Sequence, residues 1–165
     1  MSFTCRECGK CCRGLVLRDY GILRGLTLLP EETVHFPEEH VKPYLGVGKR
    51  PYDPRFNIAA YQLTTSICPH LVDEKCIIYP NRPSTCIQYP FSLDSDPAEG
   101  TLLGVDMSCP AVVELINASD GTLEFPERDS AEKLLTLKQL AAENPRKAWL
   151  YDLDTEKWIR YDKLG

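Results

Sequence analysis

Four cysteines lie within eight residues near the start of the chain, in the stretch "CRECGKCC" at residues 5–12. Cys5 and Cys8 are separated by two residues and are followed by Gly9, a spacing compatible with a zinc knuckle in which two sulfurs share one ion. With Cys11 the run becomes Cys-x2-Cys-x2-Cys, which wraps three corners of an iron–sulfur cube in bacterial ferredoxins. Metal ligation by thiolates is therefore the predicted chemistry, and this run leaves zinc and iron both open.

The other four cysteines follow a stretch of more than fifty residues that has none. Three lie in "CPHLVDEKCIIYPNRPSTCIQYP" and the last lies in "MSCPAVV". The ferredoxin pattern ends in a cysteine followed by proline, and Cys68-Pro69 and Cys109-Pro110 both supply that pair, which favours a [4Fe-4S]-type iron–sulfur cluster over Zn²⁺. The predicted metal ligands are Cys5, Cys8, Cys11, Cys12, Cys68, Cys76, Cys86 and Cys109.

The adjacent pair Cys11-Cys12 constrains how these ligands are shared. Side chains of neighbouring residues diverge, so the two thiolates are expected to bind different metals or different iron corners. Two arrangements satisfy this: two neighbouring four-ligand centres with Cys12 joining the later cysteines, or one cluster with several spare thiols. Basic residues offset the charge of thiolates. Arg82 in "YPNRPSTC" is predicted to reach the site and bind the cofactor, whereas Arg6 and Lys75 are interpreted as surface charges.

Roles other than metal ligation are less favoured for these residues. The N-terminus lacks the apolar segment of a secretory signal, so a cytoplasmic location is expected, where reductants keep thiols free and disulfides are disfavoured. A cysteine nucleophile needs a thiolate beside a base, and the clustering favours ligation instead. His70, two residues after Cys68, is interpreted as a loop histidine bonded to a backbone carbonyl rather than as a ligand.

Composition limits the classes of partner. The chain has 165 residues, of which 43% are hydrophobic and 26% charged, which is typical of a globular protein with its own core. Its net charge of −5 disfavours nucleic acid as a partner. No apolar run approaches the roughly 18 residues of a membrane helix, so no membrane is expected. The expected partner is an unidentified protein or redox partner.

The elements that must hold the cysteines are predicted to be short. The predicted class is α+β: a small irregular metal-centred domain of short strands and helices over residues 1–120, with a C-terminal helix and β-hairpin over residues 121–165 packed on it. "NIAAYQLTT" indicates a strand leading to Cys68, and "FSLDSDPAEGTLLGVDM" indicates two strands leading to Cys109. Leucines spaced by three after Asp19 indicate a helical turn, and residues 30–54 are predicted to be loop with short helical pieces.

Three further elements are predicted from Pro110 onward. Pro110 fits the first position of a helix that runs to about Asn117. In "RDSAEKLLTLKQLAAENP", Asp129 and Glu132 form a candidate capping box, and Pro145 stops the helix. "AWLYDLDTEKWIRYD" then indicates a β-hairpin with aromatic cross-strand pairs.

The combined cysteine pattern resembles the CxxCxxCC family of zinc- or iron-chelating proteins, also called YkgJ-like cysteine-cluster proteins. That family has eight cysteines and a segment of the form C-x-I-Y-x-x-R-P-x-x-C-x-x-[FY]-P. The matching positions are Cys76, Ile78, Tyr79, Arg82, Pro83, Cys86, Tyr89 and Pro90. The resemblance covers roughly residues 3 to 117 and implies metal or iron–sulfur binding with a redox or accessory role. Its alternatives are a zinc-binding structural or interaction module and an enzyme similar to flagellin lysine N-methylases, which are much longer chains.

Overall fold

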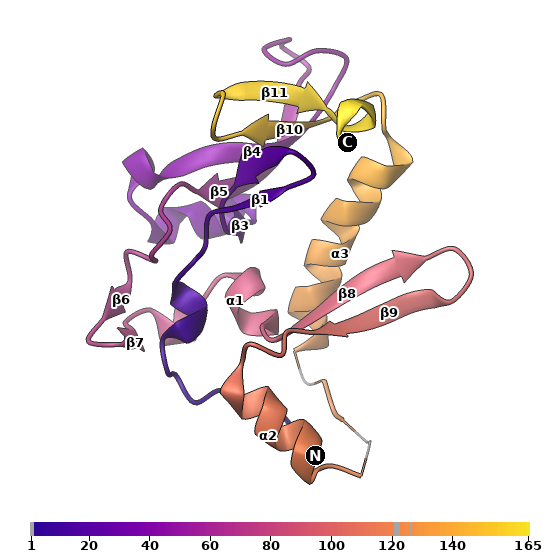
Figure 1. Ribbon diagram of the computed structural model, residues 1–165. Helices are drawn as coiled ribbons and strands as arrows, with labels where there is room; N and C mark the ends of the chain where they lie inside the picture. Colours follow the sequence, from indigo (N-terminus) through magenta and orange to yellow (C-terminus); the bar gives the residue numbers. More distant parts are fainter. Residues whose placement is uncertain (1, 121–122, 126) are drawn as a thin grey trace.

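The computed structural model describes residues 2–120, 123–125 and 127–165, and its short strands and helices confirm the predicted α+β class (Figure 1). The strands are β1 (Leu17–Asp19), β2 (Ile22–Arg24), β3 (Thr27–Leu28), β4 (Val41–Val47), β5 (Asn57–Leu63), β6 (Leu71–Val72), β7 (Lys75–Cys76), β8 (Phe91–Asp96), β9 (Gly100–Val105), β10 (Ala148–Asp152) and β11 (Lys157–Arg160). The helices are α1 (Ser84–Gln88), α2 (Pro110–Ala118) and α3 (Arg128–Glu143). Short 3-10 turns are η1 (Lys10–Cys12), η2 (Pro30–His35), η3 (Glu38–His40), η4 (Tyr79–Asn81) and η5 (Tyr161–Lys163).

In the described residues the largest sheet has the strand order β11-β10-β4-β5-β3, and each neighbouring pair is antiparallel. The predicted strand in "NIAAYQLTT" is confirmed as β5. Its partner β4 lies within residues 30–54, so the prediction of loop is wrong for this part of the stretch. Pro43 and Gly46 disfavour strands, and the sequence pattern therefore does not indicate one there. A register shift between Pro43 and Leu45 accommodates the proline, which has no N–H to donate. Gly46 is required by space, since a Cβ there would lie 2.1 Å from Cζ of Phe56.

The predicted helical turn after Asp19 is wrong. Residues 17–24 form the antiparallel hairpin β1–β2, with Asp19 paired to Ile22. The two residues between them, Tyr20 and Gly21, have φ values of 50° and 83°. Two positive φ values are the requirement of a two-residue type I′ hairpin turn. This turn reverses the chain, so Leu23 lies in the second strand of a hairpin, and Leu26 and Leu29 lie beyond it.

A buried amide joins three parts of the sheet region. Gln62 of β5 is 0% exposed. Its side chain accepts a hydrogen bond from the Gly25 N–H at 2.8 Å and donates to the carbonyls of Pro43 at 2.8 Å and Tyr151 at 3.2 Å. Each polar atom of the amide has a partner, which removes the penalty of burying it. Gln62 of β5 therefore joins β4, β10 and the segment that precedes β3.

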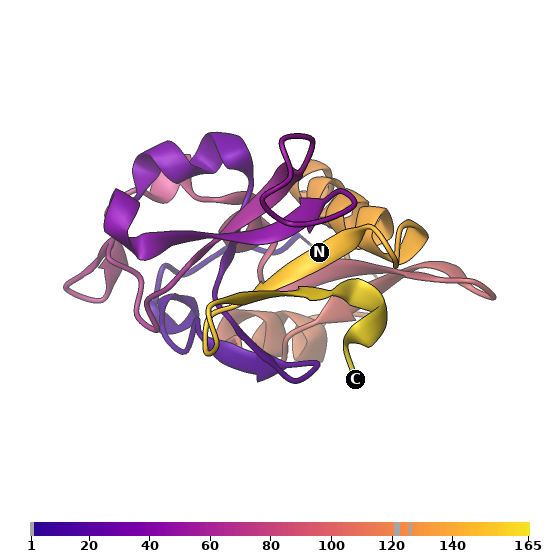
Figure 2. The same ribbon diagram turned by 90° about the horizontal axis from the view of Figure 1, so that it is seen from above.

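Helix α3 packs against the β8–β9 hairpin, which projects from the rest of the molecule in both ribbon views (Figures 1 and 2). Both the two strands predicted at residues 91–107 and the helix that follows Pro110 are confirmed. The predicted capping box of α3 is wrong: Glu127 occupies the cap position, and no side chain bonds the cap. Glu132 instead accepts from Nε of Arg128 at 2.8 Å. The helix ends at Glu143, before Pro145 as predicted.

The predicted C-terminal hairpin is confirmed as β10–β11. Tyr151 lies opposite Trp158, and their ring centroids are 5.3 Å apart in an edge-to-face arrangement. Phe56, in the loop before β5, also packs against Trp158, at 5.0 Å. Strand β10 pairs with β4, so the hairpin extends the central sheet. The two-part division stays a prediction, and its boundary meets residues 121–122, which lie outside the described residues.

None of the helices in the described ranges combines the length and the apolar character that crossing a bilayer demands.

Candidate metal centre

The first four cysteines lie in an N-terminal strap, residues 5–13, which is a series of tight turns. Gly9 has φ of 76°, a left-handed conformation that favours glycine. A Cβ at Gly9 would also lie 2.7 Å from the backbone oxygen of Glu74 in the turn between β6 and β7. The Glu7 N–H lies 3.3 Å from Sγ of Cys5, an N–H to sulfur contact within the turn. After Gly9 the chain forms η1, which carries Cys11 and Cys12.

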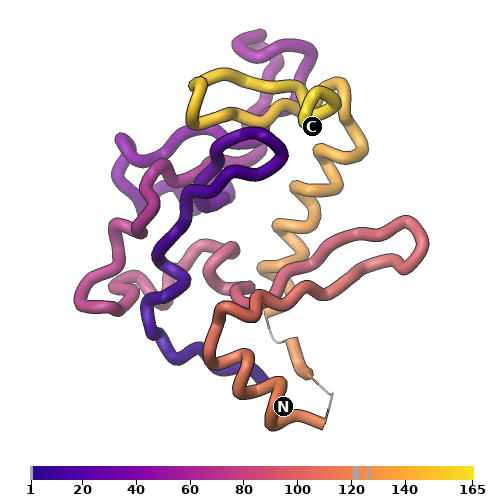
Figure 3. The backbone as a smooth tube through the Cα atoms, in the orientation of Figure 1, coloured from indigo at the N-terminus to yellow at the C-terminus, as the bar shows by residue number. Residues whose placement is uncertain are grey.

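The strap is held at each end by a different element (Figure 3). At its beginning, Arg6 forms an ion pair with Glu114 of α2, with Nη1 3.0 Å from Oε1. At its end, the Cys68 N–H donates to the Cys12 carbonyl at 2.8 Å, a backbone bond across 56 residues of chain. Arg13 also pairs with Glu74 at 2.5 Å. These contacts bring the early cysteines against the later ones.

The later cysteines come from three local structures. Cys68 precedes the β6–β7 hairpin and Cys76 ends it, with Cys76 paired to Leu71. Cys86 lies in α1, and Cys109 occupies the N-cap position of α2. Helix α1 is anchored by Glu32, whose Oε2 accepts bonds from both the N–H and the hydroxyl of Ser84, at 2.6 and 3.0 Å.

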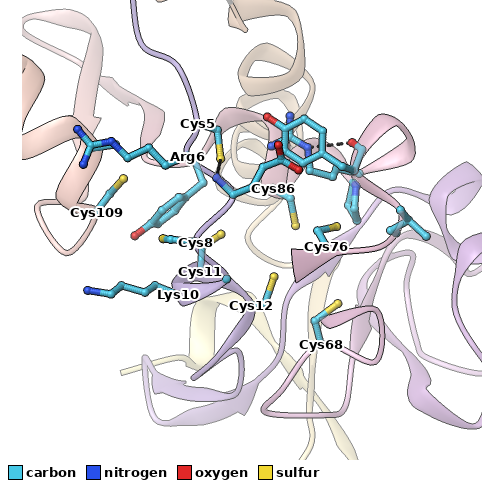
Figure 4. A pocket seen from close by; sticks show the side chains of 18 of the residues that line it. Cys5, Arg6, Cys8, Lys10, Cys11, Cys12, Cys68, Cys76, Cys86 and Cys109 are labelled. Carbon is cyan, nitrogen blue, oxygen red and sulfur yellow. Dashed lines mark hydrogen bonds between the residues drawn. The ribbon is translucent and has the colours of Figure 1, made fainter. Parts of the chain in front are cut away.

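All eight cysteines line one cavity of about 280 Å³ (Figure 4). Cys68 and Cys109 are buried and Cys8 is exposed, while the other five are partly buried. Apolar and aromatic side chains close the wall between the sulfurs, among them Phe3, Leu15, Phe36 and Ile78. Residues 104 positions apart in sequence therefore present sulfur to a common space.

Hydrogen bonds between thiols shift the pKa values of the bonded cysteines in opposite directions. The Cys12 thiol acts on both neighbours: its hydrogen bond lowers the pKa of Cys11 to about 7 and that of Cys68 to about 6. The same two bonds raise the pKa of Cys12, which keeps its proton. Burial raises the pKa of Cys86. Cys11 and Cys68 therefore favour the thiolate, the form in which cysteine binds metal, more than a free cysteine does.

Comparison with known proteins agrees with this geometry. The CxxCxxCC family, described as a "Putative zinc- or iron-chelating domain", matches residues 4–110. The chain belongs to the CxxCxxCC family. No curated protein and no solved structure matches the chain. The family match contains all eight cysteines and ends before α3 and the β10–β11 hairpin.

The donor set fits the metals named for the CxxCxxCC family. Each of the eight cysteines, all within the described part of the chain, is a free thiol. Sulfur is the ligand that zinc and iron–sulfur clusters prefer. Among residues 2–120, 123–125 and 127–165, no three Cys, His, Asp or Glu side chains form a finished site for one ion. The eight thiols are instead distributed around the lining of the cavity.

Arg82, from the family motif, lies in the cavity wall beside the sulfurs. Its guanidinium carbon is 3.8 Å from the centre of the Tyr79 ring, and its Nε donates to the Tyr79 carbonyl at 3.0 Å. Its positive charge lowers the pKa of Cys11 and opposes the burial that raises the pKa of Cys76. Binding of a cofactor by Arg82 stays a prediction. Its positive charge lies beside the cysteines, where it would stabilise thiolates.

His70 is not among the residues that line the cavity. Its Nε2 bonds the His35 carbonyl, and its ring packs against Phe36 with centroids 4.9 Å apart. The interpretation of His70 as a loop histidine bonded to a backbone carbonyl is confirmed.

The sequence reasoning missed the residues that hold the strap and α1 in place. Glu114, Glu74 and Glu32 each anchor a cysteine-bearing segment from another part of the chain. Arg6, interpreted as a surface charge, is exposed but pairs with Glu114. No local pattern announces such pairs, because the partners are 108, 61 and 52 residues apart.

Proposed function

We propose that this protein holds an iron–sulfur cluster of the [4Fe-4S] type through its cysteines and serves in a redox or accessory role. The observation that carries the proposal is that Cys109, followed by Pro110, lines the same cavity as the run Cys5-x2-Cys8-x2-Cys11. Three closely spaced cysteines with a distant Cys-Pro is the ligand pattern of bacterial ferredoxins.

The surroundings of the sulfurs support a cluster. The backbone N–H of Glu7 contacts Sγ of Cys5 at 3.3 Å. Hydrogen bonds to sulfur and nearby positive charge, here that of Arg82, are two of the factors that set the potential of a cluster. When bound, such a cluster supplies one-electron transfer.

A structural zinc site is the competing function. The left-handed Gly9 after Cys5-x2-Cys8 gives the tight turn that a zinc knuckle also uses. Zinc has no redox chemistry, so a zinc protein of this family would bind a partner or stabilise its own fold.

Anaerobic expression and purification, followed by iron, acid-labile sulfide and zinc analysis, tests the proposal. The expected protein is brown, contains iron and sulfide in equal amounts, and loses visible absorbance on reduction with dithionite. A colourless protein with stoichiometric zinc after anaerobic growth in iron-supplemented medium would refute it. Electron paramagnetic resonance of the reduced sample gives an independent readout, because zinc is silent in it.

A further inference from the structure

The contacts of the strap point to two destinations for its cysteines. Arg6, between Cys5 and Cys8, is paired with Glu114 of α2, the helix whose N-cap is Cys109. The beginning of the strap is therefore held against α2, the helix that carries Cys109.

The end of the strap is docked elsewhere. The Cys12 carbonyl accepts from the Cys68 N–H, and the Cys12 thiol contacts that of Cys68. The Arg13–Glu74 ion pair attaches the same end to the β6–β7 hairpin, which finishes at Cys76. Cys86 completes this group, since Figure 4 shows its side chain beside that of Cys76.

Figure 4 shows this separation directly: Cys109 lies at one end of the cavity, and Cys68 and Cys76 lie at the other. Cys11 lies at the border, between Cys8 and Cys12 in the same view. Its spacing of two residues from Cys8 assigns it to the first group, because Cys-x2-Cys-x2-Cys is built to share one metal centre. Each group then has four sulfurs.

We propose that the cysteines form two separate four-thiolate metal centres, an outer centre of Cys5, Cys8, Cys11 and Cys109 and an inner centre of Cys12, Cys68, Cys76 and Cys86. The division falls between Cys11 and Cys12. It rests on the proposed function in taking these thiols as metal ligands, and it holds for iron and for zinc alike. The outer centre contains the exposed Cys8, so it is the more accessible to solvent.

Limited metal removal from the wild-type chain tests the division. The metal-loaded protein is treated anaerobically with a substoichiometric chelator and then with iodoacetamide, and intact chains are separated by mass. The expected intermediate carries four alkylated cysteines, all in the outer centre, and retains half of the metal. Because Cys11 and Cys12 lie between Lys10 and Arg13, trypsin leaves them in one peptide, and fragmentation must find the label on Cys11 with Cys12 protected.

Matched variants provide a second measurement. Cys109→Ser should lose the outer half of the metal and keep the inner half, and Cys86→Ser should do the reverse. An intermediate with other members, or a direct passage from zero to eight labels, would overturn the division. Zinc in place of iron in a correctly divided intermediate would overturn the iron proposal and leave the division standing. Eight reactive thiols and no bound metal at the outset would overturn both.

Discussion

Replacing Gly9 by alanine tests whether the strap needs its close approach to the β6–β7 turn. Two costs are separable. Alanine in the left-handed conformation of Gly9, at φ of 76°, costs about 1–2 kcal/mol. Its Cβ would also meet the Glu74 oxygen at 2.7 Å and Cδ1 of Leu71 at 3.0 Å. Overpacking of this kind costs about 1–3 kcal/mol more, so Gly9→Ala should destabilise the protein by about 2–5 kcal/mol in total.

The chain contains a matched control. Gly14 has φ of 64° but open space around its missing side chain, so Gly14→Ala carries the conformational cost without the clash. The Glu74 backbone cannot easily move away, because Asp73 and Glu74 already have φ of 49° and 62° in a tight turn. Urea unfolding of both variants under reducing, metal-free conditions gives the two free energies. Equal destabilisation by the two substitutions would refute the contact argument, and Gly9→Ala should also bind less metal than Gly14→Ala.

Other residues give predictions away from the sulfurs. Gln62→Leu leaves the buried Gly25 N–H without its acceptor, so urea unfolding should show a loss of at least about 1–3 kcal/mol with metal stoichiometry unchanged. Hydrogen bonds, led by that from the Leu23 N–H, outweigh burial and lower the pKa of Asp152. Its stabilisation is present above the unfolded pKa of about 3.9 and is lost as pH falls through the folded value, so the stability gap between wild type and Asp152→Asn should close in acid titrations. Trp158→Ala removes two edge-to-face contacts, one with Phe56, and should cost at least about 1–3 kcal/mol without loss of metal.

Elements with one clear local signal could be predicted from the sequence. The hydrophobic pattern of β5, the proline at the start of α2 and the aromatic pair of the β10–β11 hairpin each specify their own structure. The failures have a common cause. At Tyr20-Gly21, two residues with positive φ form a hairpin turn although the apolar spacing suits a helix. Pro43 and Gly46 disfavour strands but lie in β4, where a register shift accommodates the proline and the Phe56 ring leaves no room for a side chain at Gly46.

The candidate site divides in the same way. Residue type and spacing identified the eight thiols, because few roles other than metal binding need Cys-x2-Cys-x2-Cys-Cys. Neither feature identified what brings them together. The Arg6–Glu114 pair and the Cys68–Cys12 backbone bond join residues from distant parts of the chain, and in the sequence Arg6 has the same appearance as a solvated charge.

The contacts also explain why the segment beyond the family match matters to the part within it. Strand β4 lies inside the matched residues, yet one of its two neighbours in the sheet is β10, which lies outside them. Gln62 and Leu23 make hydrogen bonds to Tyr151 and Asp152 of the same strand. Without β10, the buried amide and the β4 edge would lose partners that no residue of the matched segment supplies in the described structure. The hairpin thus completes a sheet whose residues Leu28 and Leu63 pack in one cluster with Cys68, although the hairpin contributes no residue to the lining of the cavity.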